Sequence, residues 1–437
     1  MPEIKPFFGI RYNPGKVPDL ASVTTQPYDQ ISESMEQEYK KASPYNYVRL
    51  ILTKESAGHD RKKEYQDAKN FGAAWLKEGI FMKDDKPSIY PYRQTFIIDK
   101  KQYQRTALIA LLKLEELGKG NILPHERTLS KPKADRLNLM RITQKNLEYV
   151  FLLYTDLKQE VIQLAELETK NPPVMDFQDR NKIKHQVWRV ADPQQINKAQ
   201  SILKNSIMVI ADGHHRYETS FSYAAERASQ NSKHTGNEPY NYRLVALVNI
   251  EDPGLVILPT HRLIKNINNF DLSQFLKTVE QYFNVKKSNE KEIARELEIA
   301  KEKAFGFYST NVSRRDQPGA YLLKLKDTGA LTKMLPGRTD DYRSLDVVIL
   351  HTVLIESLLG IKPEEIENHV KYERGIDKTI EHVKKGEFQF CFLMNPTKPG
   401  QVKAVAEQRD RMPQKSTDFF PKMLSGLVFF DMADQKV

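Results

Sequence analysis

Short β-rich runs alternate with amphipathic helical patterns from one end of this 437-residue chain to the other. The alternation predicts a mixed α and β fold, and no internal repeat or low-complexity tract interrupts it. Hydrophobic residues make up 40% and charged residues 28% of the chain, which argues against disorder, a collagen-like fibre and a polytopic membrane protein. The length corresponds to roughly two or three domains.

The expected elements follow from periodicity and run length. Helices are predicted over residues 34–41, 60–77, 132–146, 272–283, 290–303, 346–359, 363–370 and 377–384. Strands are predicted over residues 47–52, 95–99, 107–112, 149–154, 207–211, 320–326 and 388–394. The run 107–112 also fits a buried helix, although its length favours a strand. A boundary at Asp252-Pro253-Gly254 divides the chain into an N-terminal lobe (1–252) and a second α+β lobe (253–437).

The charge and cysteine content restrict the partners and the compartment. Lys and Arg number 67 against 57 Asp and Glu, a net charge of +10 that favours anionic partners and leaves nucleic acid, nucleotides and phosphorylated metabolites open. Cys391 is the single cysteine, which excludes an intramolecular disulfide and suits a reducing compartment. We find no export signal and no apolar run near the ~20 residues of a membrane span, so we expect a cytoplasmic protein without membrane contact.

The strongest signal for chemistry is the segment IMVIADGHHRYETSFSYAAERA. Its apolar start leads into Asp212, Gly213, His214, His215 and Arg216, and a helical apolar pattern follows. A tight turn between a strand and a helix directs free backbone N–H groups and the positive end of the helix dipole at one spot. The segment therefore predicts an anion site.

Each residue type of this DGHHR turn suits such a site. Gly213 permits close approach of the backbone, the two histidines donate hydrogen bonds or move protons, and Arg216 binds phosphate with two parallel bonds. Asp212 is suited to orienting a hydroxyl, binding Mg²⁺ or acting as a base. The alternative is a helix cap beside two surface histidines, which the clustering of these residue types disfavours. The chain has neither a Walker P-loop nor an HExxH helix.

Three further segments combine polar groups in ways that fit ligand binding. LPHERTLSKPKADR is a dense polar loop that fits a ligand site and a solvated connection equally well. LPTHR fits a loop pair without a ligand better than it fits a site. MPQKSTDFFPK fits core or interface packing better than contact with phosphate. Their candidate residues are His125, Glu126, Arg127, Thr128, Lys131, Lys133, Arg136, His261, Arg262, Lys415, Ser416, Thr417 and Lys422.

Taken together, these motifs resemble one family. PFFGIRYNPG, QPYDQIS, PYNYVRL, LPHERT with KPKADR, ADGHHRYETS, LPTHR, SLDVVILH and MPQKSTDFFPKMLSGL closely resemble the domain-of-unknown-function 1015 family, sometimes labelled SpoOJ/ParA/ParB/RepB-like. The resemblance covers nearly the whole chain, from Pro6 to about Leu427.

The resemblance also implies a fold and residue roles. The DGHHR element is similar to the phosphate-binding motif of the ParB/sulfiredoxin superfamily, which includes CTPases, sulfiredoxin and free-serine kinases, and it implies a ParB/sulfiredoxin-like core. By analogy with the kinase branch, Asp212, His214, His215 and Arg216 take the phosphate and metal roles. We nominate Glu126 as the separate carboxylate for the substrate hydroxyl, although its HERT surroundings match no motif of that branch.

These observations favour a nucleotide-dependent phosphotransferase acting on a small hydroxylated metabolite, such as the amino acid serine. ATP or ADP and Mg²⁺ are the expected cofactors. One alternative is a ParB-like nucleotide-gated DNA-binding module, for which we find neither a helix-turn-helix nor a basic stripe. Another is a metal-dependent phosphohydrolase that uses the paired histidines. We further expect His125, Glu126, Arg127, Lys415, Ser416 and Thr417 to share one cavity with the DGHHR turn.

Overall fold

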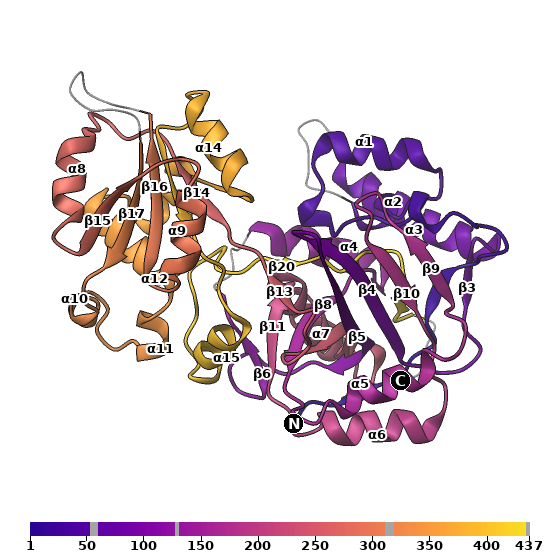
Figure 1. The fold of residues 1–437 in the computed structure, drawn as a ribbon. Helices are drawn as coiled ribbons and strands as arrows, with labels where there is room; N and C mark the ends of the chain where they lie inside the picture. The colour runs from indigo at the N-terminus through magenta and orange to yellow at the C-terminus, as the bar shows by residue number, and fades with distance from the viewer. Residues whose placement is uncertain (53–59, 127–130, 311–318, 434–437) are drawn as a thin grey trace. The chain divides into compact units, whose positions relative to one another are not determined.

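The computed structural model describes residues 1–52, 60–126, 131–310 and 319–433. The chain forms two compact units, which are treated separately below (Figure 1). Unit 1 comprises Met1–Pro124, Thr128–Val256 and Pro421–Val437, and unit 2 comprises His125–Arg127 and Ile257–Phe420. The predicted mixed α and β fold is confirmed, whereas the division into lobes 1–252 and 253–437 stays a prediction.

A nine-stranded sheet forms the centre of unit 1, counted over the described residues. Its order is β6 (Ile122–Pro124), β11 (Met208–Asp212), β8 (Val150–Tyr154), β12 (Tyr242–Asn249), β5 (Lys101–Lys113), β4 (Tyr90–Ile98), β10 (Lys184–Val187) and β9 (Met175–Gln178), with β1 (Ile4–Lys5) on β5. β8 and β12 are buried along their whole length, which suits the apolar sequence of β8 and the apolar run from Leu244 to Val248 in β12. β6 runs parallel to β11, with Pro124 opposite Ile210, so both strands end at the same edge of the sheet.

Helices and small sheets complete unit 1. They are η1 (Leu20–Ser22), η2 (Tyr28–Gln30), α1 (Glu33–Ala42), α2 (Val48–Ile51), α3 (Arg61–Lys77), α4 (Lys131–Thr143), α5 (Glu160–Glu168), α6 (Pro193–Leu203), α7 (His214–Gln230) and η3 (Pro239–Asn241), with β2 (Ile10–Tyr12) paired to β3 (Phe81–Lys83) and β7 (Lys145–Asn146) to β21 (Phe430–Asp431). Residues of α5, α6 and α7 pack with those of β5, β8, β11 and β12 in one hydrophobic core. This core holds the strand that ends at Asp212.

Unit 2 is built around a six-stranded antiparallel sheet of described residues. The strand order is β15 (Phe283–Ser288), β17 (Gly319–Leu325), β16 (Ala304–Ser309), β19 (Phe390–Met394), β14 (His261–Ile264) and β18 (Val370–Glu373). The other elements are β13 (Val256–Ile257) paired with β20 (Phe419–Phe420), α8 (Leu272–Val279), α9 (Ile293–Ala300), α10 (Gly329–Met334), α11 (Asp340–Arg343), α12 (Asp346–Ile349), the π-helix η4 (Leu350–Leu358), η5 (Pro363–Glu365), α13 (Ile366–His369), α14 (Ile376–Lys384) and α15 (Pro399–Glu407).

One predicted strand is wrong. Residues 47–52 contain the short helix α2 (Val48–Ile51) instead. The Asn46 side chain accepts a hydrogen bond from the Val48 amide at 2.9 Å, which favours a turn at this position. Val48, Leu50 and Ile51 are all buried, and so short an apolar run does not distinguish a strand from a buried helix by periodicity.

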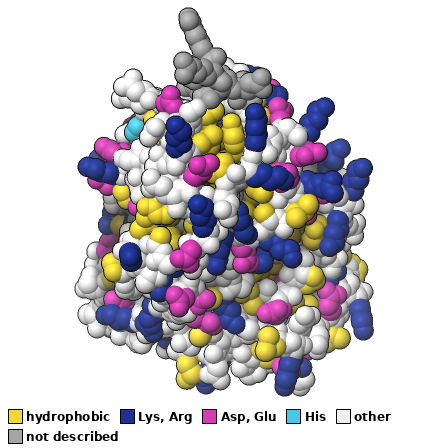
Figure 2. All heavy atoms as spheres, turned by 60° about the vertical axis from the view of Figure 1, so that its left-hand side comes forward, with side chains coloured by type: hydrophobic (Ala, Val, Ile, Leu, Met, Phe, Trp, Pro, Cys, Tyr) yellow, Lys and Arg dark blue, Asp and Glu magenta, His cyan; other side chains and the backbone are white. Residues whose placement is uncertain are grey.

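The surface and the helix lengths add two observations. On the face shown in Figure 2, Lys and Arg side chains are interspersed with acidic and apolar side chains. In the part of the chain that the structure describes, every helix is too short or too polar to cross a membrane.

Candidate anion site at the DGHHR turn

The DGHHR turn joins β11 to α7 in unit 1. β11 ends at Asp212, Gly213 has a φ of +88°, and α7 begins at His214 and continues for 17 residues. This left-handed conformation strongly favours glycine. A Cβ atom at Gly213 would lie only 3.1 Å from Nε of Arg216, so a side chain at this position would force Arg216 to shift. The predicted strand, turn and helix start are confirmed.

Arg216 supports the turn from inside the protein. Its side chain donates to the Tyr149 carbonyl and to the Asp212 carboxylate, the latter at 3.2 Å, and the residue is only 6% exposed. Burial alone would lower the Arg216 pKa, but the carboxylates of Asp212, Glu148 and others raise it above its usual value. The guanidinium is therefore bound to the protein itself, and its predicted contact with phosphate stays a prediction.

The two histidines differ in their surroundings. His214 is buried, whereas His215 is half-buried. Burial lowers the pKa of His215, with Lys133 adding to the effect and Glu218 opposing it, so the imidazole is neutral near pH 7. Its Nδ1 atom is buried without a hydrogen-bond partner. His215 therefore presents an uncharged ring with an unused nitrogen at the start of α7.

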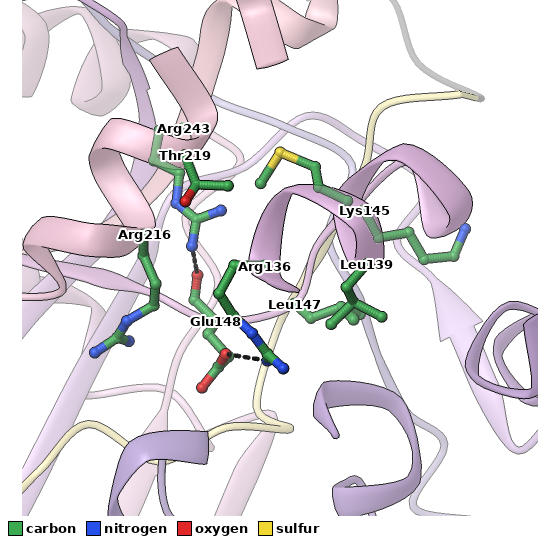
Figure 3. Close-up of a pocket in the computed structure, with 9 residues that line it drawn as sticks. Arg136, Leu139, Lys145, Leu147, Glu148, Arg216, Thr219 and Arg243 are labelled. Atoms are coloured by element: carbon green, nitrogen blue, oxygen red, sulfur yellow. Dashed lines mark hydrogen bonds and ion pairs between the residues drawn. The ribbon is translucent and has the colours of Figure 1, made fainter. Parts of the chain in front are cut away.

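A small cavity lies beside this turn within unit 1 (Figure 3). It is lined by Arg136, Leu139, Met140, Lys145, Leu147, Glu148, Arg216, Thr219 and Arg243. Its volume is about 30 Å³, room for about two water molecules. A nucleotide does not fit inside it.

Helix α4 brings part of the KPKADR motif to the same place. Lys133 forms an ion pair with Glu218 of α7. Arg136 is buried, donates to the Ile51 carbonyl and to Asp135, and stacks over the Tyr28 ring with 4.1 Å between the guanidinium carbon and the ring centroid. Two cations of the predicted polar loop are thus placed beside α7, while Lys131 and Thr128 have no described side chains.

Sequence reasoning missed several residues of this site. Glu148 accepts a hydrogen bond from the Tyr28 amide at 3.0 Å and lies 4.0 Å from Arg136. Arg243 lines the cavity from β12. Both are single charged residues at the start of apolar runs and lack a local signal. Tyr28 belongs to the QPYDQIS motif, and the resemblance of this motif to the family is the one sequence feature that marks the residue.

In unit 2, the HERT and MPQKST segments meet. The Glu126 carboxylate accepts from the Ser416 amide at 3.0 Å and the Thr417 amide at 3.4 Å. His125 Nε2 lies 2.9 Å from the Thr417 hydroxyl. These contacts hold the MPQKST loop against the HERT segment. Arg127 lies outside the described residues.

The LPTHR residues join the same cluster of unit 2. His261 and Arg262 are buried in β14, so their interpretation as a loop pair is wrong. The Arg262 guanidinium donates to the Lys415 carbonyl at 3.1 Å. Lys415 has a φ of +56°, an uncommon conformation for a residue with a side chain, which the Arg262 contact helps to hold. That this cluster shares a cavity with the DGHHR turn of unit 1 stays a prediction.

The chain matches the family "Protein of unknown function (DUF1015)" over residues 4–348 and belongs to it. The search of curated proteins found no match. Among solved structures, a conserved hypothetical protein from Pyrococcus furiosus aligns at 11% identity and a TM-score of 0.35, covering 72% of this chain and 93% of that one.

Two further solved structures align to a similar extent. A free serine kinase in complex with AMP aligns at 12% identity and a TM-score of 0.33, covering 70% of this chain and 92% of that one. SbnI with a C-terminal truncation, from Staphylococcus aureus, aligns at 10% identity and a TM-score of 0.35, covering 74% of this chain and 88% of that one. Similarities this weak carry no argument about what this chain does.

Proposed function

We propose that this protein is a nucleotide-dependent phosphotransferase acting on a small hydroxylated metabolite, and that its DGHHR turn binds the phosphate groups of ATP or ADP. The observation that carries the proposal is the geometry of the turn. The first N–H groups of the 17-residue helix α7 and the half-buried His215 both lie directly after Gly213.

The turn is rigid enough to hold an anion in one place. Arg216 links its Asp212 to the Tyr149 carbonyl, and the Gly213 carbonyl accepts from the Tyr217 amide at 2.9 Å. Within this proposal Arg216 positions the turn, while backbone amides, His214 and His215 contact phosphate. Its positive charge still lies close to the helix start and favours an anion there.

Mg²⁺ fits the site only as a phosphate-bound ion. Over the described ranges, no three His, Cys, Asp or Glu side chains gather to hold a metal ion. Asp212 is a single carboxylate at the strand end, and Mg²⁺ is commonly held by one or two carboxylates together with substrate phosphates and water. We propose Asp212 as its protein ligand, with the ion neutralising phosphate charge.

The transfer step needs a carboxylate beside the acceptor. The acceptor oxygen attacks the terminal phosphorus, the bond from that phosphorus to the bridging oxygen breaks, and the hydroxyl proton passes to the carboxylate. Glu126, which belongs to unit 2, stays our sequence-based nominee. Asp29 is a second nominee, because it is exposed and its charge acts on His215 and Arg216 within unit 1.

A transfer assay tests the proposal. The purified chain with Mg²⁺ and either ATP or ADP is incubated with serine and other small hydroxylated metabolites, and the phosphate ester is followed by ³¹P NMR. We expect the wild type to form the phosphate ester of one of these metabolites, and the Asp212→Asn variant to form none. Separate Glu126→Gln and Asp29→Asn variants identify the base, since the correct one lowers the transfer rate about 10²-fold or more. Absence of any ester with every nucleotide and acceptor would count against the proposal.

A ParB/sulfiredoxin-like core for unit 1 and a cytoplasmic location belong to the same proposal. The free thiol of Cys391 is buried in β19, which suits a reducing compartment. The interspersed charges in Figure 2 give no particular support to the DNA-binding alternative.

A further inference from the structure

Arg243 is a buried cation whose hydrogen bonds go to neutral acceptors. The residue is 2% exposed, and one terminal nitrogen donates to the Asn146 side-chain oxygen. The other terminal nitrogen donates to the Glu148 carbonyl (Figure 3). No ion pair of Arg243 is found in the described part of the chain. Burying a guanidinium without a carboxylate in hydrogen-bond contact is unfavourable.

Three polar groups around Arg243 lack partners. They are Nε of Arg243 itself, the hydroxyl of Thr219 and the side-chain nitrogen of Asn146. Thr219 and Arg243 line the cavity, and Asn146 lies between the lining residues Lys145 and Leu147. All three side chains are at least nine-tenths buried. The Arg243 and Asn146 nitrogens can only donate, so they lack an acceptor, and the Thr219 hydroxyl can donate to the same acceptor.

Three guanidinium groups line the cavity, and of these three only that of Arg243 has no carboxylate of the described residues in hydrogen-bond contact. Arg136, Arg216 and Arg243 all line it, and Glu148 is its single lining carboxylate. The Asp135 carboxylate that pairs with Arg136 also accepts two bonds from Arg61. Burial lowers the pKa of Arg243 to about 9, with the charge of Arg216 adding to the effect and that of Glu148 opposing it.

We propose that this cavity binds a small anion, no larger than a carboxylate group, that contacts Arg243 and Thr219. The volume of about 30 Å³ admits such a group. Bound there, the anion links α7 to β12 and supplies the acceptor that the unpartnered groups lack. Because Arg216 lines the cavity and also bonds to Asp212, the anion stabilises the support of the DGHHR turn. This binding does not depend on the proposed phosphotransferase function.

Thermal unfolding in defined salts tests the anion site. The full chain is melted without nucleotide at constant ionic strength, while sodium formate or chloride replaces the bulky anion isethionate. We expect a saturable rise in Tm of about 2 °C or more for the wild type. Phosphate is a third probe, and a saturable response to phosphate alone would overturn the size assignment.

Two variants locate the effect. Arg243→Met removes the charge at nearly constant length and should weaken the anion response at least tenfold. Thr219→Val keeps the shape and serves if the methionine variant does not fold. Arg141→Met is the matched control, since Arg141 is an exposed α4 residue paired with Glu226. A wild type that responds equally to all salts, or an Arg243→Met variant that keeps the saturable response, would show that the cavity holds water only.

Discussion

Gly213 and Arg216 depend on each other. The glycine adopts a φ of +88°, and Cζ of Arg216 lies 3.2 Å from the position that a Cβ atom at Gly213 would occupy. The guanidinium can bond Asp212 and Tyr149 because the turn has no side chain in its path. The motif therefore combines a conformational requirement with a requirement for space.

Gly213→Ala should lower the free energy of unfolding by about 2 kcal/mol. A left-handed conformation costs a residue with a Cβ roughly 1–2 kcal/mol, and Arg216 must also shift away. Gly236→Ala is the control, because Gly236 has a similar φ of +86° with nothing within 4 Å of a Cβ. Urea unfolding of both variants measures the difference. Equal losses would show that the Arg216 contact is without consequence.

Arg216→Met should destabilise the fold by about 3 kcal/mol, because it leaves the Asp212 carboxylate and the Tyr149 carbonyl without their donor. Urea unfolding of the single variants and of the Asp212→Asn double variant gives the coupling energy. Strictly additive losses would contradict a stabilising bond between the two side chains.

The sequence predicts those site residues that form a local pattern. Asp212 to Arg216 are visible because strand, glycine and helix follow one another within a few residues. Glu148 and Arg243 are not visible, because a single charged residue beside an apolar run carries no sign of what it contacts. Their partners lie 120 and 97 residues away in the chain, at Tyr28 and Asn146.

At the scale of elements, an ionic network connects α3 to α4. Arg61 of α3 donates two bonds to Asp135 of α4, at 2.7 and 3.1 Å, and Tyr65 adds a third at 2.7 Å. Burial alone would raise the Asp135 pKa, but the bond from Arg61 and the charge of Arg136 lower it to about 2. The native state therefore favours the charged carboxylate.

Asp135→Asn should lower the free energy of unfolding at pH 7 by about 2 kcal/mol. This figure corresponds to the lowering of the Asp135 pKa from 3.8 to about 2 on folding. Because the folded pKa lies below the unfolded one, this contribution is complete above pH 3.8 and is lost as the pH falls towards 2. Urea unfolding at pH 7 and pH 3 should show a smaller difference from wild type at pH 3. Glu226→Gln, which breaks the exposed pair with Arg141, should cost less than about 1 kcal/mol.

The elements that sequence analysis predicts correctly have clear signals at their ends. α3 (Arg61–Lys77) starts after Asp60, whose side chain accepts from the Lys63 amide. Residues 346–359 are helical as predicted, but the helix changes to a π-helix at Leu350. That change depends on a hydrogen-bond register that local periodicity does not encode.

At the scale of the whole molecule, buried histidines make the protein sensitive to acid. Burial lowers the pKa of His185 in unit 1, and in unit 2 it lowers those of His261 to about 4 and His351 to about 3. The unfolded chain binds protons near pH 6.5 while these native residues stay neutral. The contribution of these neutral histidines to the free energy of unfolding is therefore fully present above pH 6.5 and is lost as the pH falls below it.

Between pH 7 and pH 5, His261 and His351 should each remove about 2 kcal/mol of stability. Replacing His351 by leucine should reduce the pH dependence by about that amount, as measured by urea unfolding at both values. His369→Gln, at a half-buried site on α13, is the control. An unchanged pH dependence in His351→Leu would show that His351 titrates normally in the folded protein.

The sequence does not predict which distant segments of the chain join each unit. Unit 1 includes residues 421–437, and unit 2 includes the HERT residues 125–127. Pairing of MPQKST with HERT rests on side-chain bonds across about 290 residues of chain, such as Glu126 with Ser416. Periodicity identifies elements but not which remote elements meet.

The central claim is that the DGHHR turn binds nucleotide phosphate, and isothermal titration calorimetry tests it most directly. ATP and ADP, each with and without Mg²⁺, are titrated into the wild type, His215→Gln and the control His234→Gln, whose histidine is exposed beyond the end of α7. The account predicts saturable binding to the wild type and control, with at least tenfold weaker binding to a folded His215→Gln. No binding of either nucleotide to the wild type, or equal affinity in all three proteins, would contradict it.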